Sequence, residues 1–285
     1  MNPRGLDPGR LGAPGRRRPG PPRPSTRPSA RLAAPECVRV GGLSLARLDV
    51  AAVVEHLFDA LAAEQGGWLV TANVDFAQRS LTNPEISRLY AEADLTVADG
   101  TPLVWAARLQ GRPLPERVAG SDLVWLLAER AAAEGRSIYL LGGDGDAGVR
   151  AADVLVTRYP ELRIAGVSSP WLSLPPKAKE LRPLVEEVAE ARPDIVYAAM
   201  GSPKQEYVIR ALREALPTTW FMGCGISLSF IAGDVVRAPG WMQRCGLEWL
   251  HRLGQEPGRL ARRYLRDNLP FALRLLYGAV RRQEP

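Results

Sequence analysis

Short apolar runs rich in β-branched residues recur along this chain, and each ends abruptly in a polar or glycine residue before a helical stretch begins. The runs that we expect to form core strands are 68–73, 95–98, 137–141, 163–167, 194–200 and 219–222. Such runs are typical of strands buried on both faces of a parallel sheet, with the helical stretches serving as crossovers. The sequence therefore predicts an α/β fold, a Rossmann-like parallel sheet with helices on both faces.

Charge divides the chain into three parts. The formal net charge is +6, but residues 1–31 carry eight arginines and one aspartate, and residues 244–285 carry nine arginines against four acidic residues. The part between them is therefore acidic overall. We expect residues 1–35 to be a disordered tail rich in Pro, Arg and Gly, 36–243 to be the α/β domain, and 244–285 to be a helical, basic C-terminal appendage.

The composition argues against several classes of protein. Three cysteines at unpaired spacing and two histidines speak against a disulfide framework or a zinc site, which suits a reducing cytoplasm. The sequence shows neither an apolar run long enough to cross a bilayer nor the apolar core of a signal peptide. The N-terminal arginines suit anionic lipid or nucleic acid, but no aromatic residues interleave with them, so we expect a solvated tail and no nucleic-acid partner.

Two local signals concern the N-terminal part of the domain. Residues 38–40 precede a Gly-Gly pair and suit a small edge strand. Asp49 is placed to cap a helix that runs to about residue 63, because apolar residues then recur at helical spacing. We expect His56, on that helix, to have a structural role.

Polar residues gather where two of the predicted strands end. Asp99 follows the run 95–98, and Thr71 and Asn73 end the run 68–73. Open α/β sheets bind ligands in the crevice beyond the carboxyl ends of their strands, so a carboxylate there can face a substrate. The alternative is that Asp99-Gly100 is only a strand-to-helix turn, with Asp as the helix cap.

A second group of candidates follows the run 194–200. Pro203 suits the first position of a helix, Ser202 is placed to cap it, and the free N–H groups of this helix start favour an anion beside Lys204. Further along the chain, Gly223 and Gly225 would let a ligand approach the backbone closely. These segments predict an anion-binding site at the same edge of the sheet.

The glycine-rich turn 142–146 admits three interpretations. It suits a nucleotide cradle, a metal site built on Asp144 and Asp146, or an ordinary turn with a helix cap. The spacing differs from the GxGxxG fingerprint, and both aspartates are equally suited to the turn. We therefore favour the ordinary turn.

The order and spacing of several motifs over about residues 38–268 resemble the WecG/TagA/CpsF family of bacterial glycosyltransferases. The motifs are Thr71-Ala-Asn73, Ala98-Asp99-Gly100-Thr-Pro102, Arg117-Val-Ala-Gly120-Ser-Asp122, Leu140-Leu-Gly-Gly143, Gly201-Ser-Pro-Lys-Gln-Glu206, Arg237-Ala-Pro239, Gly246-Leu-Glu-Trp249, Glu256-Pro257 and Arg262-Arg-Tyr264. The resemblance implies transfer of a sugar, N-acetylmannosamine in the best-known members, from its UDP derivative to a polyprenyl-diphosphate-linked sugar. It also implies a peripheral position at the cytoplasmic face of the membrane.

The resemblance further implies roles for single residues. Asp99 would be the general base of an inverting transfer, and Arg117, Lys204 and the helix start at Ser202 would meet the charge on the leaving UDP. Other positions that would line the site or close over the diphosphate are Thr71, Asn73, Gly201, Gln205, Gly223, Gly225, Arg262 and Arg263. Neither a metal nor another cofactor would be needed. One departure is Leu228-Ser229, where the family usually has Phe-Asp.

The C-terminal part admits two interpretations. Apolar residues at 247–253 and 269–277 alternate with arginines, which suits an interfacial helix on an anionic membrane. The alternative is that these helices simply pack on the body. The resemblance favours the membrane, and the sequence is also compatible with a homo-oligomer. The rival classes for the whole chain are a nucleotide-cofactor enzyme and a non-catalytic protein that binds anions or nucleic acid.

Overall fold

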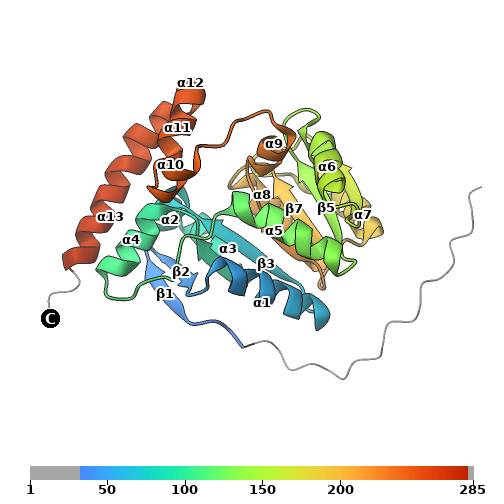
Figure 1. Ribbon diagram of the computed structural model, residues 1–285, viewed down its shortest axis with the longest axis horizontal. Helices are drawn as coiled ribbons and strands as arrows, with labels where there is room; N and C mark the ends of the chain where they lie inside the picture. Colours follow the sequence, from blue (N-terminus) through green and yellow to red (C-terminus); the bar gives the residue numbers. More distant parts are fainter. Residues whose placement is uncertain (1–32, 282–285) are drawn as a thin grey trace, which may run out of the picture. The chain divides into compact units, whose positions relative to one another are not determined.

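The computed structural model describes residues 33–281, so most of the tail predicted over 1–35 lies outside the described residues. The centre of the fold is a parallel sheet of six strands, in the order β4-β3-β8-β7-β5-β6 (Figure 1). The strands are β3 (Gly67–Ala72), β4 (Leu95–Ala98), β5 (Ser137–Gly142), β6 (Arg163–Ser168), β7 (Ile195–Ala199) and β8 (Trp220–Gly223). The predicted α/β fold is confirmed.

Helices cover both faces of this sheet because successive strand residues point to opposite sides. Trp68 and Val70 belong to one apolar core, with residues of α2, α3, α4, α7, α8 and α13, whereas Leu69 belongs to the other, with α1, α5, α6 and α9. The helices before the appendage are α1 (Val50–Ala62), α2 (Val74–Thr82), α3 (Pro84–Ala91), α4 (Thr101–Leu109), α5 (Gly120–Ala133), α6 (Ala147–Arg158), α7 (Ala178–Ala191), α8 (Lys204–Ala215) and α9 (Ser227–Ala232).

The predicted edge strand at 38–40 proves to be half of an antiparallel hairpin, β1 (Cys37–Val40) and β2 (Leu43–Ala46). Gly41 and Gly42 form its turn with φ of 56° and 81°, a backbone that favours glycine at both positions. Asp49 caps α1 as predicted, because its side chain accepts the Ala52 N–H at 2.8 Å. His56 packs edge-on against the ring of Trp220, which agrees with a structural role.

The C-terminal residues form a run of helices that meets the body along α4. They are α10 (Gly240–Arg244), α11 (Glu248–Gln255), α12 (Pro257–Ala261), the π-helix η1 (Arg262–Asn268) and α13 (Leu269–Arg281). Helix α13 lies beside α4 in Figure 1 and buries Phe271 and Ala279 in the core on that side of the sheet. The interpretation that the C-terminal helices pack on the body is therefore correct for one face of α13. Across residues 33–281, each helix is too short or too polar to span a membrane.

Candidate active site

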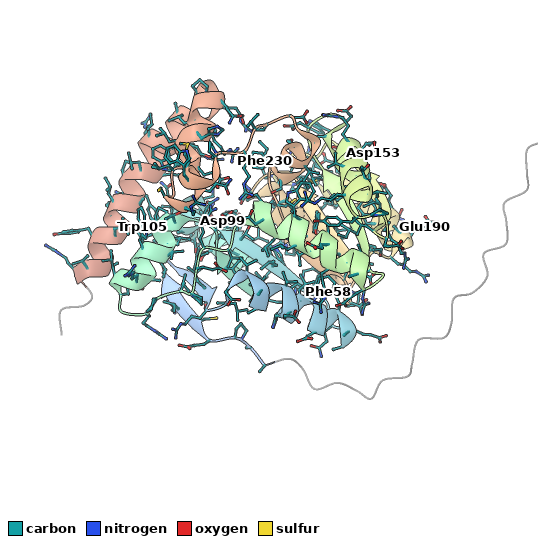
Figure 2. All side chains as sticks on the ribbon, in the orientation of Figure 1. Phe58, Asp99, Trp105, Asp153, Glu190 and Phe230 are labelled. Carbon is teal, nitrogen blue, oxygen red and sulfur yellow. The ribbon has the colours of Figure 1, made fainter. Side chains whose placement is uncertain are left out.

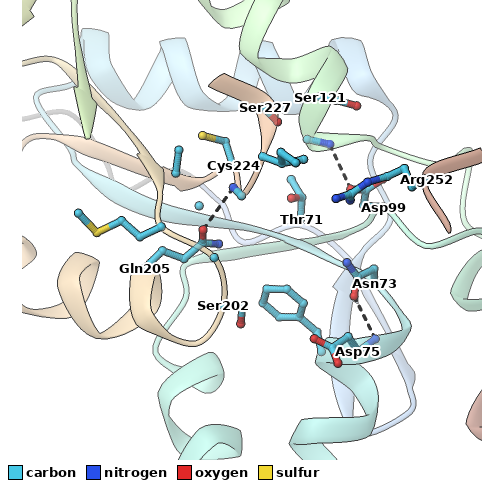
Figure 3. A pocket seen from close by; sticks show the side chains of 18 of the residues that line it. Thr71, Asn73, Asp75, Asp99, Ser121, Ser202, Gln205, Cys224, Ser227 and Arg252 are labelled. Carbon is cyan, nitrogen blue, oxygen red and sulfur yellow. Dashed lines mark hydrogen bonds between the residues drawn. The ribbon is translucent and has the colours of Figure 1, made fainter. Parts of the chain in front are cut away.

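A cavity of about 680 Å³ opens where the carboxyl ends of the strands meet the C-terminal helices (Figure 3). Its wall brings together nearly all of the predicted site residues, from segments far apart in the sequence. They are Thr71, Asn73, Asp99, Arg117, Gly201, Ser202, Lys204, Gln205, Gly223, Gly225 and Arg263. Arg262 also belongs to the described residues, but its side chain is exposed and lies outside this wall.

Asp99 follows β4, and its backbone is tied to the neighbouring strand because its N–H donates to the Ala72 carbonyl at 2.8 Å. The side chain is 27% exposed. Figure 2 shows it within the fold, unlike Asp153 and Glu190, which lie on exposed helix faces. The cap position of α4 belongs to Gly100, so the alternative that Asp99 caps this helix is wrong.

The electrostatic setting of Asp99 suits a base that works near neutral pH. Burial raises the pKa of this carboxyl to about 6, although the positive charge of Arg117 acts in the opposite direction. The negative charge of Glu248 raises the pKa further, and the Gly120 N–H, 3.5 Å from Oδ2, lowers it. A carboxylate with this pKa is deprotonated at neutral pH and still has enough basicity to accept a proton.

Thr71 and Asn73 come from the end of β3. The Asn73 side chain caps α2 by accepting the Asp75 N–H at 3.0 Å, which Figure 3 marks with a dashed line. This leaves its amide N–H groups for other partners. Gly120 lies against Thr71, where a Cβ atom would come within 2.7 Å of the Thr71 hydroxyl oxygen. The glycine therefore allows α5 to begin directly beside the strand end.

The start of α8 differs from the prediction in two details. Pro203 occupies the cap position and not the first position of the helix. The Ser202 hydroxyl lies 2.9 Å from that of Tyr90, so the expected capping by Ser202 is also wrong. The Ser202 carbonyl accepts a hydrogen bond from Arg79 at 3.0 Å. Gly201 has a φ of 72° and an open space where a Cβ would point. The backbone here is therefore accessible from the cavity.

Gln205 is buried and joins the two glycine-containing segments. Its Oε1 accepts the Gly225 N–H at 3.2 Å, and its Nε2 donates to Glu206 Oε1 at 2.9 Å. A side chain at Gly223 would collide with the Gln205 amide, which explains why glycine occupies that position. Burial raises the pKa of Glu206 to about 7, mainly because this carboxyl is almost wholly removed from solvent.

Three arginines of the C-terminal helices line the cavity: Arg252, Arg259 and Arg263. The Nε atoms of Arg252 and Arg263 have no hydrogen-bond partner among residues 33–281. Of these three arginines, only Arg263 was predicted as a site residue, together with Arg262. Arg252 lies on α11 and Arg259 on α12, and the chain leaves the helical conformation between them at Glu256, so helical spacing did not predict that these side chains share the cavity.

The glycine-rich turn after β5 provides Gly142, Gly143 and Asp144 to the cavity wall. Asp146 instead pairs with Arg150 at 3.0 Å on the surface. Within the described part of the chain, no group of three or more His, Cys, Asp or Glu residues is arranged to hold a metal ion. The two aspartates therefore face different surroundings: Asp144 faces the cavity, and Asp146 occupies the cap position of α6 without a capping hydrogen bond from its side chain.

Two further features of the wall were not predicted as site residues. Trp171 follows β6 and is 81% exposed at the cavity, so it presents an aromatic surface to a ligand. Leu228 and Ser229, the departure from the usual Phe-Asp, lie on α9: Leu228 is buried in the core, and Ser229 lines the cavity. The Leu228-Ser229 pair therefore contributes one residue to the apolar core and one to the cavity wall.

Comparison with known proteins fits this geometry. The profile of the "Glycosyl transferase WecG/TagA/CpsF family" matches residues 38–285. The chain is also 30% identical over 215 residues to the N-acetylglucosaminyldiphosphoundecaprenol N-acetyl-beta-D-mannosaminyltransferase of Bacillus spizizenii, a match that covers 75% of this chain and 81% of the relative. A parallel sheet with its cavity at the strand ends thus coincides with a sequence match over nearly the whole described chain, and the protein belongs to the WecG/TagA/CpsF family of glycosyltransferases.

Proposed function

We propose that this glycosyltransferase moves N-acetylmannosamine, or a related hexose, from a UDP-sugar to a sugar linked to a polyprenyl diphosphate, in the synthesis of a cell-surface polysaccharide or teichoic acid. The observation that carries the proposal is the Asp99 carboxylate, at the end of β4, in a cavity that Lys204, Arg252, Arg259 and Arg263 also line. The relative's name describes an acceptor of this kind, an N-acetylglucosaminyl diphosphoundecaprenol. The cavity volume is within the range of small-molecule sites.

In the proposed reaction, Asp99 accepts the proton of the acceptor hydroxyl as that oxygen attacks the anomeric carbon of the donor. The bond from this carbon to the UDP oxygen breaks, and its electron pair leaves with UDP. Because attack and departure occur on opposite faces, the anomeric configuration inverts. Asp99 is suited to this role because its pKa is raised to about 6 by burial.

The departing diphosphate gathers negative charge, which preorganised positive groups and N–H donors stabilise. Lys204, Arg252, Arg259 and Arg263 all line the cavity. Thr71, Asn73 and Gln205 then contact the donor, and Arg117 stands beside the base. The charge of these side chains supports a reaction without a metal ion.

The metal-independent mechanism makes a direct prediction: EDTA leaves the rate of transfer unchanged. Initial rates with and without the chelator, followed by addition of Mg²⁺, provide the measurement. Strong inhibition that Mg²⁺ reverses would instead assign a metal-binding role to the turn that contains Asp144.

The C-terminal helices support a position at the cytoplasmic face of the membrane. Large apolar side chains on η1 and α13 are exposed to solvent: Leu265, Leu269, Leu273, Tyr277 and Val280. Exposed arginines accompany them at positions 262, 266, 274 and 281. Apolar and cationic residues together on one exposed helix suit an anionic bilayer, where the lipid-linked acceptor resides. We therefore treat 36–243 as the catalytic domain and 244–285 as an appendage that closes the site at the membrane.

The test is a transfer assay with a panel of UDP-sugars and a short-chain polyprenyl-diphosphate-linked N-acetylglucosamine. Product formation from UDP-N-acetylmannosamine, or from one related UDP-hexose, is the expected result. Thermal stabilisation by UDP, compared with NAD and single-stranded DNA, gives an independent measurement. Stabilisation by NAD or DNA alone, without transfer from any UDP-sugar, would contradict the proposal.

A further inference from the structure

Glu248, the first residue of α11, reaches the Asp99–Arg117 pair from the C-terminal helices. Its side chain is 16% exposed and forms part of the cavity wall. Glu248 Oε2 lies 3.2 Å from Arg117 Nη1, and Oε1 lies 3.5 Å from Arg237 Nε. Arg237 in turn pairs with Asp122 of α5. Two arginines thus alternate with three carboxylates in one connected network.

Within this network two carboxylates compete for a single guanidinium nitrogen. Arg117 Nη1 is 3.5 Å from Asp99 Oδ1 and 3.2 Å from Glu248 Oε2, so the nearer partner is Glu248. An arginine paired with Asp99 alone would lower the pKa of that carboxyl by roughly 1–3 units. Such a carboxylate would be a poor acceptor for the proton of a sugar hydroxyl.

We propose that Glu248 is a positioning residue that holds the Arg117 guanidinium partly away from Asp99 and offsets its charge, so that Asp99 keeps the basicity that the transfer needs. This inference rests on the proposed function of Asp99 as the base. It goes further by assigning the C-terminal helices an electrostatic role in the chemical step, in addition to closing the site. The contact spans 131 residues of sequence.

The charged and polar groups that face Asp99 come from three segments. Arg117 lies in the segment before α5, Asp122 and the Gly120 N–H belong to the first turn of α5, and Glu248 belongs to α11. Burial remains the largest influence on Asp99, and Glu248 and Asp122 both oppose Arg117. Removing the charge of Glu248 takes away a negative charge that raises the pKa of Asp99. It also leaves Arg117 without its nearer partner, so the guanidinium acts more strongly on Asp99. Both changes lower the pKa of Asp99.

The variant that tests this inference is Glu248→Gln, which keeps the size of the side chain and removes its charge. We expect the acidic limb of the kcat profile to move to lower pH by about 1 unit, the small end of the effect of an adjacent arginine. The plateau of kcat falls by on the order of 10-fold because Asp99 is a weaker base. UDP affinity and the melting temperature are measured on the same samples.

Arg237→Gln is the matched control, because it removes the ion pair between Arg237 and Glu248 but leaves the negative charge of Glu248 in place. A merely structural role for Glu248 predicts the same change for both variants. The proposed role predicts that Arg237→Gln lowers the melting temperature without moving the acidic limb to lower pH. The double variant Arg117→Gln, Glu248→Gln removes both charges, so its acidic limb should lie above that of Glu248→Gln alone.

Direct titration of Asp99 by carboxyl NMR separates this inference from the proposed function. Selective ¹³C labelling of aspartate, with Asp99→Asn to assign the signal, measures the pKa in the wild type and in Glu248→Gln without any substrate. A fall of about 1 unit in the variant supports the inference. An unchanged pKa, or the same shift in Arg237→Gln, overturns it even if transfer is observed. Absence of transfer by the wild type would instead overturn the proposed function.

Discussion

Thr71, Asn73 and Asp99 line the cavity from the ends of buried strands, whereas Arg252, Arg259 and Arg263 line it from the C-terminal helices. We call the first group the floor and the second group the cover. The floor is fixed by the backbone, since β3 and β4 pair in register over four residues and the Asp99 N–H extends that pairing. The backbone of the floor is therefore held by the sheet.

The helices that carry the cover, α11, α12 and η1, bury fewer side chains than the helices that pack on the sheet. Of the C-terminal helices in the described chain, α10 and α11 contain no buried residue, and α12 and η1 each contain one, Leu260 and Tyr264. Polar ties such as Glu248–Arg117 hold the cover over the floor. Segments with few buried contacts open at low free-energy cost. Under the proposed function, the firmly held floor carries the base, and the less firmly packed cover supplies positive charge to the donor.

The largest effect is expected from Asp99→Asn, which removes the base but keeps the shape of the floor. Transfer should fall by on the order of 10²–10⁴-fold, the usual scale for general-base catalysis. UDP affinity should stay nearly unchanged, because in the proposed complex the arginines of the cover, and not Asp99, bind the diphosphate. Turnover and calorimetric UDP binding are the two measurements, and near-wild-type turnover would remove Asp99 from the mechanism.

The cover offers a matched pair of adjacent arginines. Arg263 lines the cavity, and Arg262 is exposed outside it. Arg263→Ala should weaken transfer by roughly 10- to 100-fold with a detergent-dispersed acceptor, since a hydrogen bond to a charged group contributes about 1.5–3 kcal/mol. Arg262→Ala should have a much smaller effect in the same assay. Equal losses in the two variants would mean that the arginines act through net charge and not through contact with the donor.

A third variant tests the exposed face of α13. Leu273 is 61% exposed on α13, so Leu273→Glu should cost the fold little and reduce binding to anionic liposomes by about 10-fold. Co-sedimentation with vesicles of phosphatidylglycerol and phosphatidylcholine measures this. Binding equal to that of the wild type would mean that this face of α13 does not contribute to membrane binding.

The smallest effect concerns stability. The folded-state pKa of Asp99 is raised from 3.8 to about 6, so its ionised form is disfavoured in the fold, and stability is lost as pH rises through this range. Asp99→Asn should therefore raise the melting temperature by a few degrees at pH 7.5 and by much less at pH 4. Scanning calorimetry at the two pH values gives the comparison. A lower melting temperature at pH 7.5 would mean that the charge of Asp99 stabilises the floor.

Most of the floor could be predicted from the sequence because its signals are local. The run 95–98 is β4, and Asp99 follows it at once, so a strand pattern and one polar residue sufficed. The sequence did not predict helix α2. Asn73 suits both the end of a strand and the N-cap of a helix, and in the structure it caps α2. The capping expected of Ser202 failed because its hydroxyl meets Tyr90, 112 residues away in sequence.

The cover was harder to predict because its contacts are long-range. The basic helical segment was visible in composition, but the partners of Arg117 and Arg237 on α11 depend on how the helices fold back over the sheet. The π-helix at 262–268 also shifts the phase of the helix that carries Arg263. Spacing alone therefore could not separate Arg262 from Arg263 with certainty.

In the proposed reaction, a single displacement takes place with Asp99 as the base. The anomeric configuration of the product tests this most directly, because one displacement inverts the donor's configuration. With an α-linked UDP-sugar, NMR of the purified product should show a β-linkage. An α-linked product would contradict the account, since retention requires a second displacement or a different role for Asp99.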